Sequence, residues 1–301
     1  MATDLLIETF LNYLKLELLR SECTVKGYRS DLLEFNAFLS AEDETVDWKD
    51  VDADLVRRWM EQLMDKGYSP ASVNRKLSSL RTFYKLLMRE KVVRVSPLAG
   101  LRGPKRKRPL PYFVKEGDMN SLLDETDFGE GFEACRDKVV ILMFYTTGIR
   151  LSELVGLDDT DVDFVSMQLK VLGKGNKQRV IPFGADLRDA LLDYISSRDE
   201  NCECADEAFI VNKKGHRICR SKVQALVRKH LSKVVRMKKR SPHVLRHSFA
   251  TSLLNNQAEL GVVKELLGHE SLAATEVYTH MTFEELKQVY KHAHPRAQKE
   301  K

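Results

Sequence analysis

The sequence has few of the features that mark a membrane-spanning or secreted protein. No apolar run approaches the roughly 18 residues that cross a bilayer, and the longest, Val139–Tyr145, is only long enough for a core segment. The first residues, Met1 to Asp4, lack the basic and apolar pattern of a secretory signal. Only five cysteines occur among 301 residues, at irregular positions, which argues against a disulfide framework. We therefore expect a protein of the reducing cytoplasm.

Proline and glycine are also sparse, and their positions divide the chain. Four of the eight prolines fall between residues 96 and 111, together with two glycines, and this composition prevents regular secondary structure. Before this segment, apolar residues recur at helical spacing; beyond it, the pattern is mixed. We therefore predict a helical domain over residues 1–98, a linker over 99–111 and a second domain over 112–301.

Acidic residues are rare in two stretches, and this separates the charge along the chain. Residues 1–54 contain five basic and thirteen acidic side chains, whereas residues 55–108 contain fifteen basic and three acidic ones. Residues 221–240 contain eight basic side chains and no acidic one. A single basic helix is more often a solvated face, but two separate basic blocks indicate a polyanionic partner such as nucleic acid.

The candidate phosphate contacts of the first domain lie on one helix and in the linker. The helix is predicted to begin at Ser69 and Pro70, a typical cap and first-turn pair, and has apolar residues on one side. The linker carries a basic tetrad, which we interpret as a strap that contacts phosphates in preference to a localisation signal. The predicted DNA-binding residues are Arg75, Lys76, Arg81, Lys105, Arg106, Lys107 and Arg108.

The second domain is predicted to combine helices with a β-hairpin. Cys135–Tyr145 is an apolar helix, and Arg150 follows at the start of the next helix. Gln168–Leu172 and Arg179–Pro182 are short β-prone runs on either side of a glycine-rich turn, which predicts a hairpin with Lys174 at its tip. The fold class is therefore mainly α with a small β-hairpin or sheet.

The polar residues that stand out in the second domain include no carboxylate. Ser241 and Pro242 mark a helix start, which puts His243 and Arg246 on one face near the positive end of the helix dipole. Guanidiniums can neutralise the non-bridging oxygens of a phosphodiester, imidazoles and an ammonium can move protons, and a phenol can attack phosphorus. Such a site would cut DNA by forming a protein–DNA bond. The candidate catalytic residues are Arg150, Lys174, His243, Arg246, His269 and Tyr278.

A metal site is the main alternative of a different class. His243 and His247 have the spacing of helical zinc ligands, but no glutamate lies between them and Arg246 would repel a cation. A second candidate has the less usual Cys-x-Cys spacing and consists of Cys202, Cys204, His216 and Cys219. We expect no metal site and interpret these cysteines as free thiols.

The ordered set of motifs resembles the tyrosine recombinases, and most of all their Xer branch. The resemblance covers nearly the whole chain and implies an N-terminal, SAM-like core-binding domain (1–98), the basic linker (99–111) and a mixed α/β catalytic domain with a C-terminal exchange helix (112–301). The segments that carry it are 146–154 (TTGIRLSEL), 173–177 (GKGNK), 243–251 (HVLRHSFAT), 266–269 (LLGH), 278–280 (YTH) and 290–297 (YKHAHPRA).

The resemblance implies which residues bind and break the phosphodiester. Arg150 and Arg246 would clamp the scissile phosphate and offset the charge that develops on its oxygens. Tyr278 would attack phosphorus and remain attached as a 3′-phosphotyrosine. Because this bond conserves the energy of the phosphodiester, a free 5′ hydroxyl from another strand can reverse the step. Neither ATP nor a metal is required, so no cofactor is expected.

The remaining three residues would handle protons and orientation. His243 would act as a base or hydrogen-bond donor, and His269 would orient the phosphate. Lys174 would protonate the departing 5′ oxygen.

The resemblance also implies partners and a biological role. Such enzymes act as homo- or hetero-tetramers on two DNA duplexes, and the helix expected over residues 283–293 would be donated to a neighbour. In Xer systems a sister recombinase and a DNA translocase are further partners. The expected role is resolution of chromosome dimers at a dif-like site on the nucleoid. A mobile-element integrase, a type IB topoisomerase and a protein that only binds DNA remain as alternatives.

Overall fold

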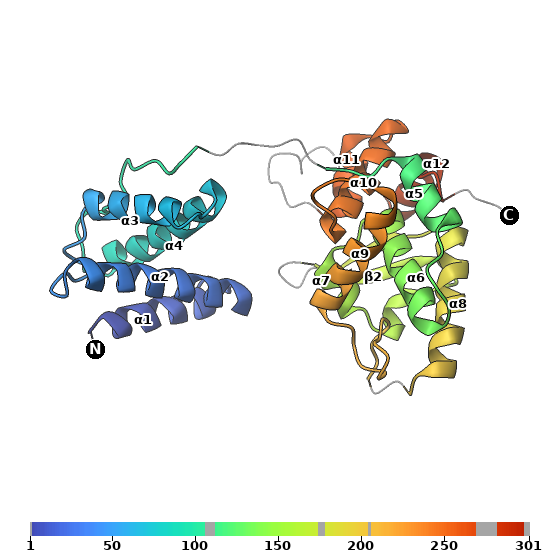
Figure 1. The fold of residues 1–301 in the computed structure, drawn as a ribbon, viewed down its shortest axis with the longest axis horizontal. Coiled ribbons are helices and arrows are strands. Elements are labelled where there is room, and N and C mark those ends of the chain that lie inside the picture. The colour runs from blue at the N-terminus through green and yellow to red at the C-terminus, as the bar shows by residue number, and fades with distance from the viewer. Residues whose placement is uncertain (1, 106–111, 174–177, 204–205, 269–281, 298–301) are drawn as a thin grey trace. The chain divides into compact units, whose positions relative to one another are not determined.

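The computed structural model describes residues 2–105, 112–173, 178–203, 206–268 and 282–297. The chain divides into two compact units, Met1–Pro109 and Leu110–Lys301, each of which has its own core (Figure 1). Both units are mainly helical, and the second also holds a small sheet, which confirms the predicted fold class. No helix in the described part of the chain is long and apolar enough to cross a membrane.

The first unit is a bundle of helices around an aromatic core. α4 packs against α2 and α3, and α1 packs against α2. Ser69 caps α4 by accepting a hydrogen bond from the backbone N–H of Ser72, with Pro70 in the first turn, as predicted. The helices are α1 (Ala2–Leu16), α2 (Glu22–Glu42), α3 (Ala53–Asp65) and α4 (Pro70–Arg89).

The second unit is organised around the helix α6. α6 is buried on almost every side because α8, α9 and α10 pack against it, and this accounts for its long apolar run (Figure 1). The helices are α5 (Glu116–Asn120), which continues into the π-helical turn η1 (Ser121–Glu125), α6 (Phe132–Thr147), α7 (Leu151–Gly156), the 3₁₀ turn η2 (Asp159–Asp161), α8 (Ala185–Asn201), α9 (Arg220–Val234), α10 (Pro242–Asn255), α11 (Leu260–Leu267) and α12 (Phe283–Ala293).

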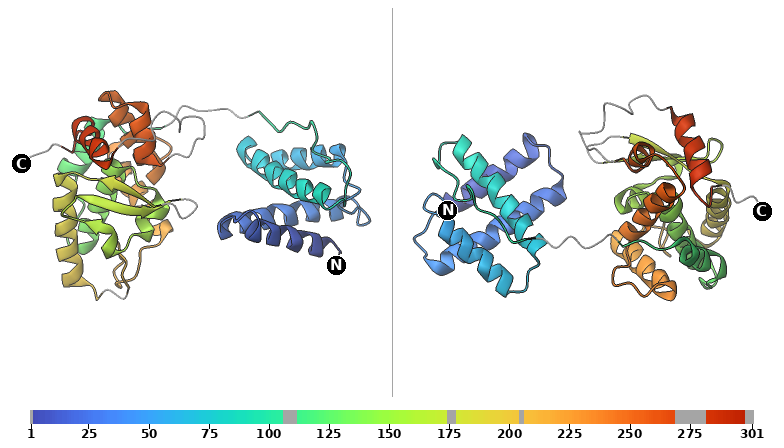
Figure 2. Two further views of the ribbon diagram at one scale, coloured as in Figure 1. Left: turned by 180° about the vertical axis from the view of Figure 1, so that it is seen from behind. Right: turned by 90° about the horizontal axis from the view of Figure 1, so that it is seen from above.

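The sheet contains the predicted hairpin and one further strand. β2 (Gln168–Leu172) pairs antiparallel with β3 (Gln178–Pro182), and Leu172 lies opposite Gln178. β1 (Val162–Asp163) pairs with the other edge of β2. With two residues it is too short to show an alternating pattern, so it was not predicted. The predicted tip residue, Lys174, lies outside the described residues. Figure 2 shows the sheet beside α8 and α12, and α12 contacts β3.

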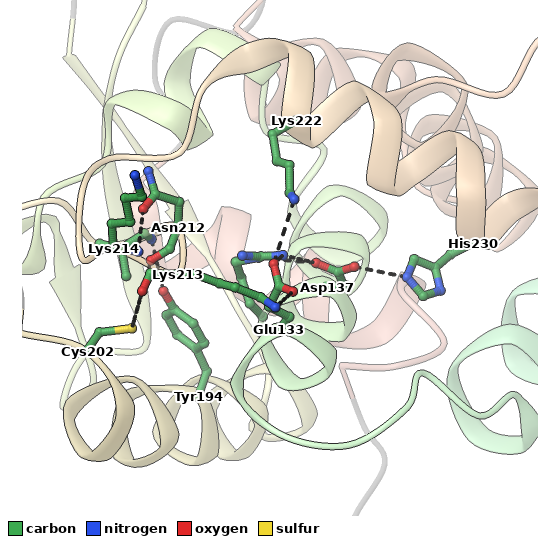
Figure 3. Close-up of polar contacts among 11 residues, drawn as sticks. Glu133, Asp137, Tyr194, Cys202, Asn212, Lys213, Lys214, Lys222 and His230 are labelled. Atoms are coloured by element: carbon green, nitrogen blue, oxygen red, sulfur yellow. Dashed lines mark hydrogen bonds and ion pairs between the residues drawn. The ribbon is translucent and has the colours of Figure 1, made fainter.

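A buried polar network joins α6 to α9. Asp137 of α6 accepts hydrogen bonds from the guanidinium of its neighbour Arg136 and contacts Nε2 of His230 on α9 at 3.1 Å (Figure 3). Burial opposes ionisation of Asp137, but these hydrogen bonds outweigh it and hold the pKa of the carboxyl below its ordinary value. The ring of Phe128 stacks on His230 at 4.5 Å. The network therefore fixes α9 on the central helix.

The segment after α12 is anchored on its own domain. His294 is 1% exposed, and its Nε2 contacts the carbonyl oxygen of Tyr145 at 3.1 Å. Arg296 is also buried and donates to Asp186 on α8 at 2.9 Å and to Asp124 of η1 at 2.7 Å. α12 itself buries Leu286, Tyr290 and Ala293. In this single chain, α12 and the described residues that follow it, 294–297, therefore pack in cis.

Candidate active site

The site begins at the turn that ends α6. Gly148 adopts the left-handed conformation with φ of 59° and caps the helix through a bond from its N–H to the carbonyl of Phe144. A Cβ atom added at this position would lie 2.4 Å from the ring of Phe249 on α10. The turn therefore requires glycine for conformation and for space, and it delivers Arg150 to the N-cap position of α7.

Arg150 is held by a carboxylate and by a helix end. Its backbone N–H donates to Oε2 of Glu153 at 2.8 Å, and its Nη1 donates to Oε1 at 2.7 Å. Its Nη2 donates to the carbonyl oxygen of Gly268 at 2.6 Å. Glu153 occupies the third position of α7, so its carboxylate accepts from the cap backbone as in one half of a capping box; the arginine side chain has no acceptor for the reciprocal bond. The side chain of Arg150 stays 30% exposed.

Arg246 reaches the same helix end from α10. It is 9% exposed, its Nη1 donates to the carbonyl of Gly148, and its Nη2 donates to the carbonyl of Leu267 at 2.5 Å. These carbonyls lie at the C-terminal ends of α6 and α11, where the helix dipole favours a cation. The last two carbonyls of the α11 end, at Leu267 and Gly268, thus bring the two predicted arginines together.

The charges around Arg246 are unbalanced. Burial, with added repulsion from Arg150 and Arg179, lowers the pKa of Arg246 to about 10, although it stays protonated at neutral pH. Burial disfavours the charged form of Glu153, but the hydrogen bonds from Arg179 and Arg150 prevail and hold its pKa below the ordinary value. The three guanidiniums of Arg150, Arg179 and Arg246 therefore lie near the one carboxylate of Glu153, which bonds only the first two, and the excess positive charge suits an anion such as a phosphate.

The other predicted catalytic residues are placed only in part. His243 is exposed in the first turn of α10, one turn before the buried Arg246. Lys174, His269 and Tyr278 lie outside the described residues. The structure thus brings Arg150 and Arg246 together and puts His243 on the adjoining turn.

Two residues of the site were missed in the sequence. Glu153 could have been recognised, because an acidic residue three positions after a helix cap is the pattern of a capping box. Arg179 of β3 donates to both oxygens of Glu153, at 2.5 and 2.9 Å. The two residues are 26 positions apart, and only the packing of the sheet on α7 makes them neighbours.

The predicted phosphate contacts of the first unit need one correction. Lys76 is 4% exposed, and its ammonium contacts Asp31 at 3.2 Å and Glu34 at 2.5 Å, so it is a buried ion-pair partner and was wrongly predicted as a surface cation. Arg75 also binds Asp31, but its side chain is 56% exposed. Arg81 is exposed and donates to the carbonyl of Leu101.

The linker residues are described only at their start. Lys105 is exposed, whereas Arg106, Lys107 and Arg108 lie outside the described residues.

The cysteine residues make ordinary contacts. Cys202 approaches the carbonyl oxygens of Asn212 and Lys213 at 3.8 and 3.9 Å (Figure 3), and Cys219 contacts Ser221 at 3.2 Å. Cys204 is not among the described residues. Within the described part of the chain, no group of three or more His, Cys, Asp or Glu side chains is arranged to hold a metal ion.

The fold matches solved structures of DNA recombinases. The XerH site-specific recombinase bound to a palindromic difH substrate superposes with a TM-score of 0.71, covering 89% of this chain and 79% of that chain at 21% identity. The integrase of the Tn1549 transposon, in complex with transposon right-end DNA, superposes with a TM-score of 0.69, covering 94% of this chain and 97% of that chain at 18% identity.

Sequence comparison identifies nearer relatives. The tyrosine recombinase XerC of Staphylococcus aureus is 39% identical, covering 97% of both chains. The tyrosine recombinase XerC of Chlorobaculum tepidum is 38% identical, covering 91% of this chain and 89% of the relative. The N-terminal SAM-like domain of phage integrases matches residues 7–91, and the phage integrase family matches residues 113–285. With the paired arginines in place, these matches show that the chain belongs to the phage integrase family and is a tyrosine recombinase.

Proposed function

We propose that this chain recombines double-stranded DNA at short specific sites through a 3′-phosphotyrosyl link at Tyr278, and that it resolves chromosome dimers at a dif-like site. The observation that carries the proposal is the pair of guanidiniums of Arg150 and Arg246, which two successive carbonyls at the end of α11 hold together. A phosphodiester has two non-bridging oxygens, and a pair of fixed guanidiniums can donate to both.

The proposed reaction has two matched steps. In the first, the phenol oxygen of Tyr278 bonds to phosphorus, the bond to the 5′ oxygen breaks, and Lys174 gives that oxygen a proton. The phenolic proton passes to a nearby acceptor, for which His243 is the candidate at the start of α10. In the second, a 5′ hydroxyl of the partner strand displaces Tyr278, so the number of phosphodiester bonds is unchanged.

Arg150 and Arg246 act on the charge rather than on protons. In the pentacoordinate transition state, more negative charge resides on the non-bridging oxygens than in the ground state. The two guanidiniums are already ordered by helix-end carbonyls, so they need little reorganisation when that charge appears. His269 would complete the phosphate site.

The chromosomal role rests on the relatives. The two curated relatives described above are both named XerC, and each matches this chain along nearly its whole length. Neither is named as an integrase of a mobile element, so we prefer the chromosomal role. The proposed location is the nucleoid.

The proposed assembly is a tetramer on two duplexes. In the single chain, α12 contacts α10, α11 and β3 of its own domain. The same surface would accept α12 from a neighbour if the helices exchange around the tetramer. Because exchange replaces one set of contacts with an equivalent set, it need not cost much free energy. A sister recombinase and a DNA translocase remain candidate partners.

Covalent capture tests the chemistry. The wild-type chain and Tyr278→Phe are incubated with a panel of nicked, dif-like suicide duplexes in EDTA and separated on a denaturing gel. We expect the wild type to form a slowly migrating adduct, and Tyr278→Phe to form none while it shifts the same DNA in a native gel. The missing hydroxyl removes the nucleophile but not the phosphate contacts.

Three outcomes would contradict the proposal. An adduct formed by Tyr278→Phe would assign the nucleophile to another residue. An adduct that EDTA abolishes would mean that the chemistry requires a metal. Relaxation of a supercoiled plasmid that lacks any captured site would favour a topoisomerase.

A further inference from the structure

The Glu153 carboxylate serves two arginines at once, and this sharing sets how each arginine is held. Arg150 uses its backbone N–H and one side-chain nitrogen on Glu153, and Arg179 uses two side-chain nitrogens. All four contacts lie between 2.5 and 2.9 Å, and the Glu153 side chain is 1% exposed. A carboxylate accepts about four hydrogen bonds, so Glu153 is saturated.

The sharing leaves the exposed part of the Arg150 guanidinium available to an anion. Arg179 forms the two-pronged contact with Glu153, whereas the side chain of Arg150 makes only a single bond to it. The remaining arm of Arg150 bonds Gly268, and its side chain is 30% exposed compared with 14% for Arg179. If Arg179 were absent, Glu153 could bind Arg150 with both oxygens as a closed, neutral pair, which has little attraction for phosphate.

A second contact places Arg179 against the same helix end that holds the arginine pair. A Cβ atom added to Gly268 would lie 3.0 Å from Cδ and 3.2 Å from Nη1 of Arg179. Arg179 therefore fills the space between Glu153 and the end of α11. Its charge also acts on Arg246, because it contributes to the lowered pKa of that residue.

We propose that Arg179 is a positioning residue of the active site, which neutralises Glu153 and so keeps Arg150 available as a cation for the scissile phosphate. The inference rests on the proposed phosphodiester chemistry and deepens it. Arg179 comes from β3, the strand that follows Lys174 in the sequence. β3, which comes shortly after the proposed general acid Lys174 in the sequence, thus also sets the charge of the phosphate site.

The test compares Arg179→Gln, Arg179→Lys and the double variant Glu153→Gln/Arg179→Gln with the full-length wild type. The readouts are the single-turnover rate of adduct formation at saturating protein, the Kd for the same duplex and the Tm of each variant. The matched control is Arg188→Gln, which removes one partly exposed arginine that pairs with its neighbour Asp189 on α8.

We expect Arg179→Gln to slow adduct formation by about 10²-fold, the usual effect of losing one electrostatic contribution to a transition state, while the Kd changes by less than about threefold. Arg179→Lys should lose about tenfold, because it keeps the charge but not the two-pronged contact. The double variant should be at least about tenfold faster than Arg179→Gln, because the carboxylate that captures Arg150 is gone as well. Arg188→Gln should match the wild type.

The rate of the double variant relative to Arg179→Gln distinguishes a positioning role of Arg179 from other roles. If the double variant is no faster than Arg179→Gln, Arg179 acts on the phosphate directly or only supports the fold, and the proposal is wrong. It is also wrong if Arg179→Gln cleaves at the wild-type rate. Should Arg179→Gln fail to fold, as its Tm would reveal, a loss of about 10²-fold in a folded Glu153→Gln/Arg179→Gln variant would equally overturn it. A wild type that forms no adduct under any condition would instead refute the proposed chemistry.

Discussion

At the scale of single residues, backbone carbonyls fix the arginines as firmly as side chains do. Arg246 is bound by the carbonyls of Gly148 and Leu267, and Arg150 by that of Gly268. Both glycines adopt the left-handed conformation, which turns the chain away and leaves the last carbonyls of each helix open. Gly148 and Gly268 therefore matter because they expose the carbonyl oxygens that orient Arg150 and Arg246.

His294 provides a residue-scale link between pH and stability. Its Nε2 donates to the carbonyl of Tyr145, and its Nδ1 accepts a bond from the backbone N–H of Arg296 at 3.2 Å, so the neutral ring has both nitrogens satisfied. Tyr290 stacks on the ring at 5.5 Å. Burial, opposed by the bond to Tyr145 and assisted by the charge of Arg296, lowers the pKa of His294 to about 4.

We predict that acid destabilises the second unit through His294. Between about pH 6.5 and pH 4 the unfolded chain binds a proton at this residue and the folded chain does not, so the free energy of unfolding falls as the pH falls, by about 2 kcal/mol at pH 5. Urea unfolding at pH 7.5 and pH 5.0 should show this loss in the wild type and not in His294→Gln. His292→Gln, at an exposed position of α12, should retain the wild-type loss. An equal loss in His294→Gln would assign the pH dependence to other groups.

At the scale of elements, a buried ion cluster joins α2 to α4. Asp31 is 1% exposed and accepts hydrogen bonds from Arg75 at 2.6 and 2.7 Å and from Ser79 at 2.7 Å, and it pairs with Lys76 at 3.2 Å. The negative charge of Asp31 and the positive charges of Arg75 and Lys76 compensate one another only while all three side chains are present. Removing one partner of a buried ion pair lowers the free energy of unfolding by more than the pair itself contributes, because the other charge stays buried without compensation.

We predict that Asp31→Ala destabilises the first unit by about 3–5 kcal/mol. Both tryptophans of the chain, Trp48 and Trp59, lie in the core of this unit, so tryptophan fluorescence during urea unfolding reports on it alone. Glu61→Ala, at an exposed position of α3, is the control and should change stability by less than about 0.5 kcal/mol. A small effect of Asp31→Ala would mean that Lys76 finds water or another partner.

Most elements could be predicted from the sequence because their signals are local. The apolar run of α6, the Ser-Pro start of α4 and the β-prone runs of β2 and β3 each depend on neighbouring residues. Lys76 was mispredicted although a local signal existed, since it lies three residues after Val73 and four before Leu80, within the buried stripe of α4. The bond between Glu153 and Arg179 could not be predicted, because it depends on how the sheet packs against α7.

At the scale of the whole molecule, the charge distribution predicts how the chain holds DNA. The acidic residues concentrate in residues 1–54, and the basic residues of the first unit concentrate in 55–108. The tetrad that begins at Lys105 falls in the predicted linker segment of the sequence, so we infer that it contacts the DNA backbone. Contacts of this kind release counterions and make affinity depend on salt.

We predict that replacing all four residues of the tetrad, 105–108, with glutamine weakens DNA binding. The negative slope of the logarithm of the association constant against the logarithm of the salt concentration should become shallower by about 3 to 4, close to 0.9 for each lost phosphate contact. The rate of adduct formation on saturated DNA should not change. Lys26→Gln, in the acidic segment and 81% exposed, should leave the slope as it is. An unchanged slope in the quadruple variant would mean that the tetrad does not touch phosphates.

The saturated carboxylate of Glu153 also limits how this site can change during evolution. A first substitution at position 153 or at position 179 leaves either an unbalanced guanidinium or an unbalanced carboxylate, so each change is harmful until the other follows. Recombinases that differ at one of these positions should therefore differ at both, whereas position 150 stays fixed by its proposed contact with the scissile phosphate. The pair would be visible as correlated substitutions among relatives, without any measurement on this protein.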